Sequence, residues 1–247
     1  MNLDWYSEAM AAQTEETLAA LEAKITVLEK SSWSKLTGDD DVAADNITKE
    51  LKRVRRHVQQ SNCFSSTWKH CPSNYYSLSL DERKVILGAK STSQLCKGCL
   101  FENKNYKPNE NNEGDTKGGV DPTNSKYYLV VVQYVESINT KKLASELRGL
   151  RPVGANRFDP NYFVDMRLAS EEDNAKLTGF QHNGVSPFGM LDNNSIPIVL
   201  CKSVINIRPK FIWMGGGHPD WKLGMAVTEF VKGLNAIVLD ISEPREL

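Results

Sequence analysis

Two glycine-rich turns carry the residue types and spacing that predict chemistry in this chain. The first runs from Gly179 to Gly189 and includes Gly184-Val-Ser-Pro-Phe-Gly189, and the second is Gly215-Gly216-Gly217. Glycine allows positive φ and lets a ligand approach the peptide N–H groups closely, while Pro187 has a fixed φ and stiffens its turn. Such turns form nests that hold a carboxylate, a phosphate or a developing oxyanion. The alternative is an ordinary loop between strands.

A lone lysine, Lys97, is the third candidate. It lies among Leu95, Cys96, Cys99 and Leu100, in a segment that we expect to be a buried strand over residues 94–102. Burying an unpaired ammonium is costly, so a lysine in such a strand indicates a role in a pocket. The alternative is that the side chain extends to the surface and its ammonium stays in water.

The cysteines predict neither a disulfide framework nor a metal site. The chain has five of them, an odd number, and its first residues lack the pattern of a signal peptide, so we expect reduced thiols and a cytoplasmic location. Cys96-Lys-Gly-Cys99 has the spacing of a metal knuckle, but side chains on a strand alternate between its faces. We therefore expect no metal and no other cofactor. A zinc hydrolase using Cys96, Cys99 and a histidine is the weaker alternative.

Length and composition indicate a globular protein. The chain has 247 residues, 40% of them hydrophobic, and a net charge of −1. No apolar run approaches the roughly 18 residues that span a bilayer, so we expect no membrane association. A net charge so near zero gives no bulk attraction for nucleic acid, so a nucleic-acid interface would have to be local.

Two helices are predicted before residue 60. The first helix, over residues 1–30, is acidic, and its apolar seam of Leu18, Leu21, Ile25 and Leu28 resembles that of a short coiled coil. Three roles are open for this helix: it binds a partner, it dimerises, or it folds back on its own domain. The second helix, residues 42–60, is basic. Its charged side chains either follow a phosphate backbone or simply face solvent. Its candidate tRNA-binding residues are Lys49, Lys52, Arg53, Arg55 and Arg56.

The sequence pattern after residue 60 predicts short strands that alternate with helices. We therefore expect an N-terminal extension over residues 1–60 and a mixed α/β domain over residues 61–247. Polar residues 103–126 are expected to form a flexible loop. Strands are expected at 94–102, 127–134, 196–201, 210–214 and 236–240. Helices are expected at 80–87, 139–147 with Thr140 as cap and Gly149 as stop, 170–177 and 225–232.

The order of these motifs resembles the YbaK/ProX family of aminoacyl-tRNA editing domains, in its eukaryotic branch with an N-terminal extension. The resemblance covers about residues 78–242, and its most specific segment is Gly184-Val-Ser-Pro-Phe-Gly189. The other segments are Leu95-Cys-Lys97-Gly, Lys142-Leu-Ala-Ser-Glu-Leu147, Ala169-Ser-Glu-Glu172, Thr178-Gly179 and Gly215-Gly216-Gly217.

The resemblance implies an α+β fold with a barrel-like mixed β-sheet flanked by helices. It also implies hydrolysis of the ester between a wrong amino acid and the terminal adenosine of tRNA, with aminoacyl-tRNA as partner. In that scheme Lys97 is the catalytic residue that orients the substrate, the turn binds the ester carbonyl, and the 2′-hydroxyl of the adenosine helps to activate water. The implied substrate-binding residues are Gly179, Asn183, Gly184, Ser186, Pro187, Gly189, Gly215, Gly216, Gly217 and His218.

Three positions depart from the family pattern, namely Gly98, Asn183 and Gly215, and they leave the amino acid open. His182 and His218 are alternative general bases. The competing function is a non-catalytic adaptor, in which a degenerate editing domain binds tRNA or a synthetase complex and the helix over residues 1–30 is its working part. The sequence does not predict an oligomeric state.

Overall fold

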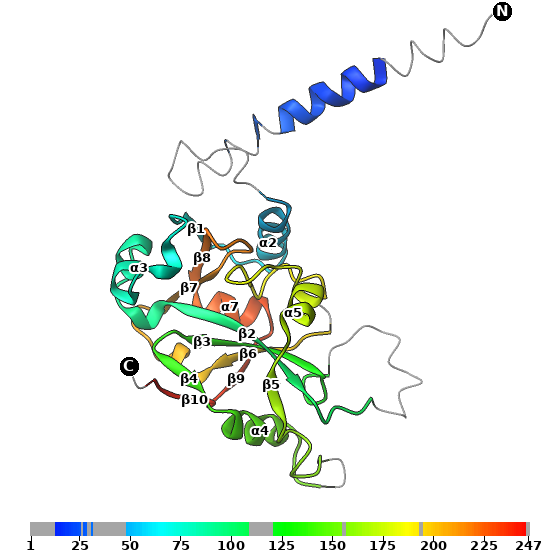
Figure 1. Cartoon of the computed structure of the whole chain (residues 1–247), viewed down its shortest axis with the longest axis vertical. Coiled ribbons are helices and arrows are strands. Elements are labelled where there is room, and N and C mark those ends of the chain that lie inside the picture. Colours follow the sequence, from blue (N-terminus) through cyan, green and yellow to red (C-terminus); the bar gives the residue numbers. More distant parts are fainter. Residues whose placement is uncertain are drawn as a thin grey trace, which may run out of the picture. The chain divides into compact units, whose positions relative to one another are not determined.

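The computed structural model describes residues 13–25, 27–28, 31, 48–108, 121–154, 157–192 and 195–245. The chain divides into two units, Met1–Thr48 and Lys49–Leu247. In the first, residues 13–25 are helical (Figure 1) and the side chains of Leu18, Leu21 and Ile25 are exposed. Within the described residues, no helix combines the length and the apolar character that crossing a membrane requires.

The second unit has the mixed α+β fold expected from the sequence. Its main sheet has the strand order β5-β2-β3-β6-β9. Strand β2 pairs antiparallel with β3 and β5, whereas β3, β6 and β9 are parallel to one another, so the sheet is mixed. The strands are β2 (Cys96–Asn103), β3 (Tyr127–Gln133), β5 (Met166–Leu168), β6 (Ile198–Cys201) and β9 (Ile237–Leu239).

Two smaller antiparallel sheets complete the described strands. One has the order β1-β8-β7 and the other pairs β10 with β4. A single isolated bridge, between Leu95 and Trp213, connects β7 to the segment before β2. Because no longer ladder joins the sheets, they do not close into a barrel over the described residues, which corrects the barrel-like expectation. The strands are β1 (Thr67–His70), β4 (Glu136–Ile138), β7 (Phe211–Gly215), β8 (Trp221–Ala226) and β10 (Ser242–Pro244).

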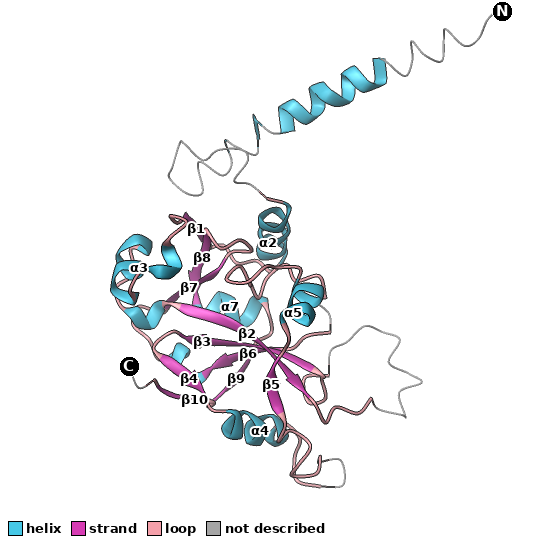
Figure 2. Cartoon of the chain, viewed as in Figure 1, coloured by secondary structure: helices cyan, strands magenta, loops and turns pink. Residues whose placement is uncertain are grey.

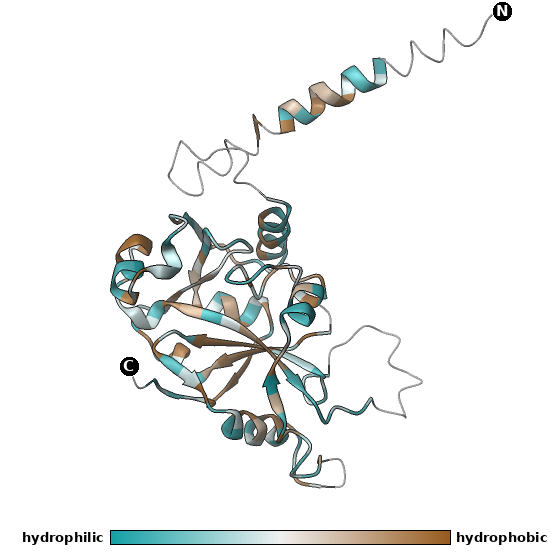
Figure 3. Cartoon of the chain, viewed as in Figure 1, coloured by the Kyte–Doolittle hydropathy of each residue, from teal (hydrophilic) through white to brown (hydrophobic). Residues whose placement is uncertain are grey.

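Helices surround these sheets, as Figure 2 shows, and α4 contacts β5. They are α2 (Lys49–Gln60), α3 (Leu80–Leu87), α4 (Thr140–Gly149), α5 (Glu171–Thr178), α6 (Lys202–Ile205) and α7 (Val227–Gly233), with short 3-10 helices at Tyr75–Ser77 and Thr92–Gln94. The central strands are strongly hydrophobic (Figure 3), and Tyr128–Val132 of β3 are fully buried. The hydrophobic core of this unit therefore lies on the mixed sheet.

Helix α2 packs within the second unit. Its apolar face, Leu51, Val54 and Val58, is buried. Of the helix expected over residues 42–60, positions 42–47 lie outside the described residues. Half of the loop expected over residues 103–126 likewise falls outside them, because residues 109–120 are not described.

Local signals explain several helix ends. Ser79 and Glu82 form a capping box on α3, and Gly88 ends that helix at a φ of 66°. The expected cap of α4 is wrong by one residue. The side chain of Asn139 accepts hydrogen bonds from the amides of Lys141 and Lys142, so Asn139 is the cap and Thr140 the first helical residue. Gly149 is the last residue of the helix.

The sequence missed strands β1, β4, β5, β8 and β10. Strand β1 lies in a segment rich in turn residues, and it forms because its four residues pair with β8, where Trp68 faces Leu223 and is buried. Strand β8 extends to Ala226, so the helix expected from Met225 begins at Val227. The five cysteines are free thiols.

The cap assignment makes a prediction about stability. Asn139→Ala removes the acceptor of two backbone amides, so we expect it to lower the free energy of unfolding by about 1 kcal/mol. Thr140→Ala is the matched control and should change it by less than about 0.5 kcal/mol. Urea unfolding of both variants measures the difference. An equal loss in the two variants would contradict Asn139 as the cap.

Candidate functional site

Lys97 lies on β2 at the wall of a cavity of about 720 Å³. This volume is within the range of small-molecule sites in proteins. Strand β2, helix α5, the turn after α5, the end of β7 and the segment before α3 all contribute to it. The lining residues are Tyr76, Arg83, Cys96, Lys97, Gly98, Cys99, Leu100, Tyr134, Leu168, Ala169, Glu171, Asn174, Ala175, Phe180, Gln181, His182, Asn183, Val185 and Gly215.

The ammonium of Lys97 is placed by an aromatic ring. Lys97 is half-buried, and its Nζ lies 5.7 Å from the centroid of the Tyr134 ring. The guanidinium of Arg83 lies 5.5 Å from the same ring. Lys97 takes part in none of the ion pairs between described residues. Two cations therefore line one side of the cavity, and that of Lys97 is available to an anionic or polar ligand.

Tyr76 fixes one end of the turn that faces Lys97. Its hydroxyl donates a hydrogen bond of 2.5 Å to the carbonyl oxygen of Asn183, which has a φ of 64°. Arg83 in turn donates to the carbonyl oxygens of Tyr76, at 2.6 Å, and Leu78, at 3.0 Å. Burial raises the pKa of Tyr76 and of Tyr134, so both hydroxyls stay protonated at neutral pH.

The turn Gly184–Gly189 has two faces. Val185 lines the Lys97 cavity, whereas Pro187 lines a second cavity of about 560 Å³. Ser186 between them is fully buried, and its hydroxyl accepts a hydrogen bond from the amide of Phe188 at 3.2 Å. Thus the predicted substrate-binding residues of this turn do not all face the same space.

Most glycine amides of the two turns are engaged within the protein. Gly184 donates to the carbonyl of Gln181 at 3.0 Å, Gly216 to that of Trp221 at 3.0 Å, and Gly217 to that of Gly184 at 3.1 Å. Within the described part of the chain, by contrast, the amides of Asn183 and Val185 donate no hydrogen bond. Both residues line the cavity, as do Gln181 and His182, whose amides likewise donate no hydrogen bond within the described residues.

Close backbone approach explains Gly215. A Cβ at this position would lie 2.1 Å from the carbonyl oxygen of Val185, so no other residue fits without moving the turn. Gly215 is thus required where the end of β7 meets the turn, and it lines the cavity with Lys97. Gly98 is different, since a Cβ there would meet the nearest atom, on Val185, at an ordinary 3.6 Å.

Three other predicted glycines contact α2 instead. A Cβ on Gly179 would lie 2.7 Å from Nη2 of Arg53, and a Cβ on Gly189 or Gly217 would lie 2.8 Å from atoms of Val54. All three have positive φ, at 69°, 70° and 102°. None of them lines the Lys97 cavity. Their conformation lets the turns pack closely on this helix.

Arg53 of the basic helix points into the same contact. Its guanidinium donates to the carbonyl oxygens of Thr178 and Gly179, each at 3.1 Å, and its Nε donates to that of Gly189. It also lies 4.8 Å from the centroid of the Phe180 ring. Burial lowers its pKa from the ordinary value. Of the other predicted tRNA-binding residues, Lys49, Lys52 and Arg56 are exposed and Arg55 is half-buried.

The structure therefore gathers Lys97, Asn183 and Gly215 at one cavity, with Gly184 beside them. His182 also lines it and lies 3.9 Å from Glu171. His218 does not, and its Nδ1 accepts a hydrogen bond from the amide of Asp220. Sequence reasoning missed the wall residues Tyr76, Arg83, Tyr134 and Val185, although Val185 lies within the motif that it singled out.

Cys96 and Cys99 belong to no cluster of metal-binding side chains among the residues that the structure describes. Within the described ranges, no group of three histidine, cysteine, aspartate or glutamate side chains is placed to hold a metal ion. Burial raises the pKa of the thiols of Cys96 and Cys99. A protonated thiol is a poor ligand and a poor nucleophile.

Comparison with known proteins shows the fold. No family model matches the chain, and no curated protein sequence matches it. A structure described as a "putative trans-editing enzyme for prolyl tRNA synthetase" is 19% identical with a TM-score of 0.57, over 79% of this chain and 98% of that one. A scaffold used for epitope backbone grafting is 19% identical with a TM-score of 0.56, over 80% of this chain and 99% of that one. Likeness at this identity shows that the chain shares the fold of these structures and nothing finer.

The contacts of Arg53 predict that it stabilises the fold. Arg53→Met keeps the aliphatic part of the side chain but leaves three carbonyls without their donor, and we expect a loss of about 2 kcal/mol in the free energy of unfolding. Arg56→Met, one turn away and exposed, should cost less than about 0.5 kcal/mol. Chemical denaturation compares the two. Equal stability of both variants would show that the Arg53 contacts are not needed for the fold.

Proposed function

We propose that this protein is an aminoacyl-tRNA deacylase that acts in trans on mischarged tRNA. The observation that carries the proposal is the Lys97 ammonium at a cavity that is also lined by Asn183 and Val185, whose amides donate no hydrogen bond within the described residues. The YbaK-like fold and the likeness to a structure described as a trans-editing enzyme support it.

In this proposal, Lys97 binds the terminal phosphate or ribose and orients the ester. The amides of Asn183 and Val185 donate to the carbonyl oxygen, which becomes an oxyanion when water adds to the carbonyl carbon. The bond from that carbon to the ribose oxygen then breaks, and the ribose oxygen takes up a proton. Tyr76 contributes indirectly, because its hydrogen bond holds the carbonyl of Asn183 and thereby the conformation of the turn.

Water activation in this scheme needs no protein base, since the neighbouring ribose hydroxyl serves. His182 is the protein group that could replace it, because it lines the cavity and His218 does not. The side chain of His182 is 77% exposed, so a substrate can reach it without rearrangement. His182→Ala therefore separates the two routes: substrate-assisted activation predicts retained turnover.

A non-catalytic adaptor is the second candidate. One observation favours it: the side chains of the predicted apolar seam, Leu18, Leu21, Ile25 and Leu28, are exposed. An exposed apolar seam on a helix is typical of a partner-binding surface. In this alternative that helix binds a synthetase complex, and the Lys97 cavity holds tRNA without hydrolysing the ester.

The catalytic role of Lys97 is tested on a panel of mischarged tRNAs. We expect wild-type protein to hydrolyse at least one ester and Lys97→Met to lower its kcat/KM by at least about 100-fold, equivalent to roughly 2.7 kcal/mol. Lys141→Met, which changes an exposed side chain of α4, is the matched control and should retain full activity. No turnover on any ester, with tRNA binding retained, would favour the adaptor. Equal activity of Lys97→Met and wild type would remove Lys97 from the mechanism.

The basic helix supplies tRNA affinity in this proposal, through its exposed side chains. We expect the double variant Lys52→Glu/Arg56→Glu to bind tRNA about tenfold more weakly, with a salt-dependence slope shallower by about 1 to 2, because fewer phosphates are neutralised. The double variant Lys141→Glu/Lys232→Glu makes the same change in net charge on other helices and serves as control. Filter binding at several salt concentrations measures both. A similar loss in the two would mean that only net charge matters.

A further inference from the structure

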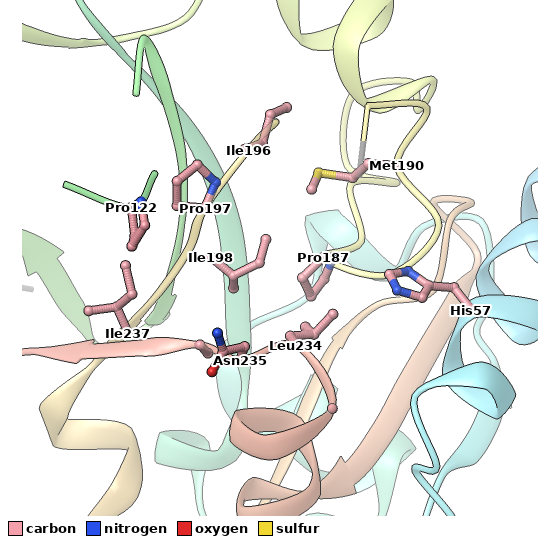
Figure 4. A pocket seen from close by; sticks show the side chains of 12 residues that line it. His57, Pro122, Pro187, Met190, Ile196, Pro197, Ile198, Leu234, Asn235 and Ile237 are labelled. Atoms are coloured by element: carbon pink, nitrogen blue, oxygen red, sulfur yellow. The ribbon is translucent and has the colours of Figure 1, made fainter. Parts of the chain in front are cut away.

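The second cavity lies on the other side of the Gly184–Gly189 turn from Lys97. Its volume is about 560 Å³, and it is bounded by α2, the turn, the chain before β6 and the segment from α7 into β9. Figure 4 shows Pro187 and His57 at one side of this cavity and Pro122 and Ile237 at the other. It shares one wall with the proposed catalytic cavity and no lining residue.

The lining selects against charged ligands. None of the described residues that line it is lysine, arginine, aspartate or glutamate, so the lining offers a phosphate or carboxylate no counter-charge. Pro122, Pro187 and Pro197 offer rigid apolar rings, and aliphatic side chains fill most of the rest. Such a lining fits a neutral group with apolar faces.

His57 provides a hydrogen-bond donor at one side of the cavity, and its contacts fix which ring nitrogen carries the proton. His57 reaches from α2, and its Nδ1 accepts a hydrogen bond of 2.8 Å from the amide of Gly189. An accepting Nδ1 carries no proton, so the neutral ring carries its proton on Nε2. Burial lowers the pKa of His57, which favours this neutral form. The ring also packs edge-on against Phe188 at 5.5 Å, which holds its orientation.

Asn235 supplies both kinds of hydrogen-bonding group at the opposite side. It is exposed, lines the cavity and has a φ of 49°. Its carboxamide offers a donor and an acceptor on one planar group. Figure 4 shows this side chain beside Leu234 at the floor of the cavity.

We infer that this cavity binds a nucleobase, with the attached sugar and phosphate left in solvent. A nucleobase is neutral, planar and weakly solvated on its faces, and its edge carries the donors and acceptors that a histidine N–H and a carboxamide recognise. The inference rests on the proposed function only for the source of the base, an unpaired nucleotide of the tRNA other than the one that bears the ester. A free nucleoside has the same chemistry.

The test uses the full chain and four probes: adenosine, cytidine, guanosine and uridine. We expect at least one to bind at least tenfold more tightly than ribose 5-phosphate, which has charge and sugar but no base, in titrations followed by calorimetry or NMR. Asn235→Gly removes the carboxamide and tolerates the positive φ, so it should weaken that binding about tenfold without unfolding the protein. Ile237→Trp should abolish it by filling the cavity.

Further variants separate this site from the catalytic one. Lys97→Met should leave nucleoside binding unchanged while it lowers hydrolysis, so loss of the deacylase hypothesis would not remove the nucleobase site. Binding of no nucleoside, equal binding of ribose 5-phosphate, or equal binding by wild type and Ile237→Trp would each overturn the inference.

Two substrates, mischarged tRNA and a minimal aminoacyl-adenosine ester, show whether the bound base belongs to tRNA or to a free nucleoside. If it belongs to tRNA, Asn235→Gly should raise KM for mischarged tRNA several-fold and leave hydrolysis of a minimal aminoacyl-adenosine ester unchanged. If nucleosides bind but both substrates are unaffected, the cavity takes a free nucleoside, and the nucleobase assignment still holds.

Discussion

The contact between α2 and the glycine turns is the interaction on which the site depends. Residues 180–192 form no helix or strand, so their backbone groups need partners from elsewhere. Helix α2 provides both a hydrogen-bond donor and a hydrogen-bond acceptor. Arg53 donates to the carbonyls that end α5 and to that of Gly189, and one turn along the helix His57 accepts the amide of Gly189. Without this helix, the turn would lose the contacts that hold its shape.

This dependence explains why one short turn can serve two cavities. Because Ser186 is buried and hydrogen-bonded, Val185 and Pro187 on either side of it are held facing different spaces. Gly215 then closes on Val185 at a distance that excludes any Cβ. The turn is thus a partition between cavities, fixed from one side by α2 and from the other by the end of β7.

The sequence predicted what depends on local pattern. The β-branched run of β3 carries a strong local signal, and the structure bears it out. Strand β1 has no such signal, because its pairing with β8 comes from a segment about 150 residues away. Lys97 could be singled out because a lysine among apolar residues is unusual. Its neighbours Tyr76 and Arg83 could not, because only the tertiary fold brings them to the cavity.

The glycines illustrate the same limit more sharply. Gly179, Gly189, Gly215 and Gly217 are equivalent in sequence, since each indicates positive φ or close approach. The structure assigns the close approach to different neighbours, which are α2 for Gly189 and Gly217, Leu191 together with Arg53 of α2 for Gly179, and the Val185 carbonyl for Gly215. A sequence predicts that something must come near a glycine, but whether that neighbour is a ligand or the protein itself is decided by the fold.

The cations behind the Lys97 cavity show how its wall keeps its hydrogen-bond pattern. Lys222 is buried, and its Nζ lies 4.5 Å and 4.7 Å from the ring centroids of Tyr75 and Tyr76. Burial lowers the pKa of Lys222 to about 8, which marks the low polarity of this region. The same low polarity raises the pKa of Tyr76, so its hydroxyl remains a donor to Asn183. Arg83 and Lys222 lie against the ring and contribute cation–π attraction that holds it in place. The carbonyl of Asn183 is thus held by a neutral hydroxyl whose ring contacts two cations, Arg83 and Lys222. Lys97, in contrast, is the cation to which the proposal assigns the substrate.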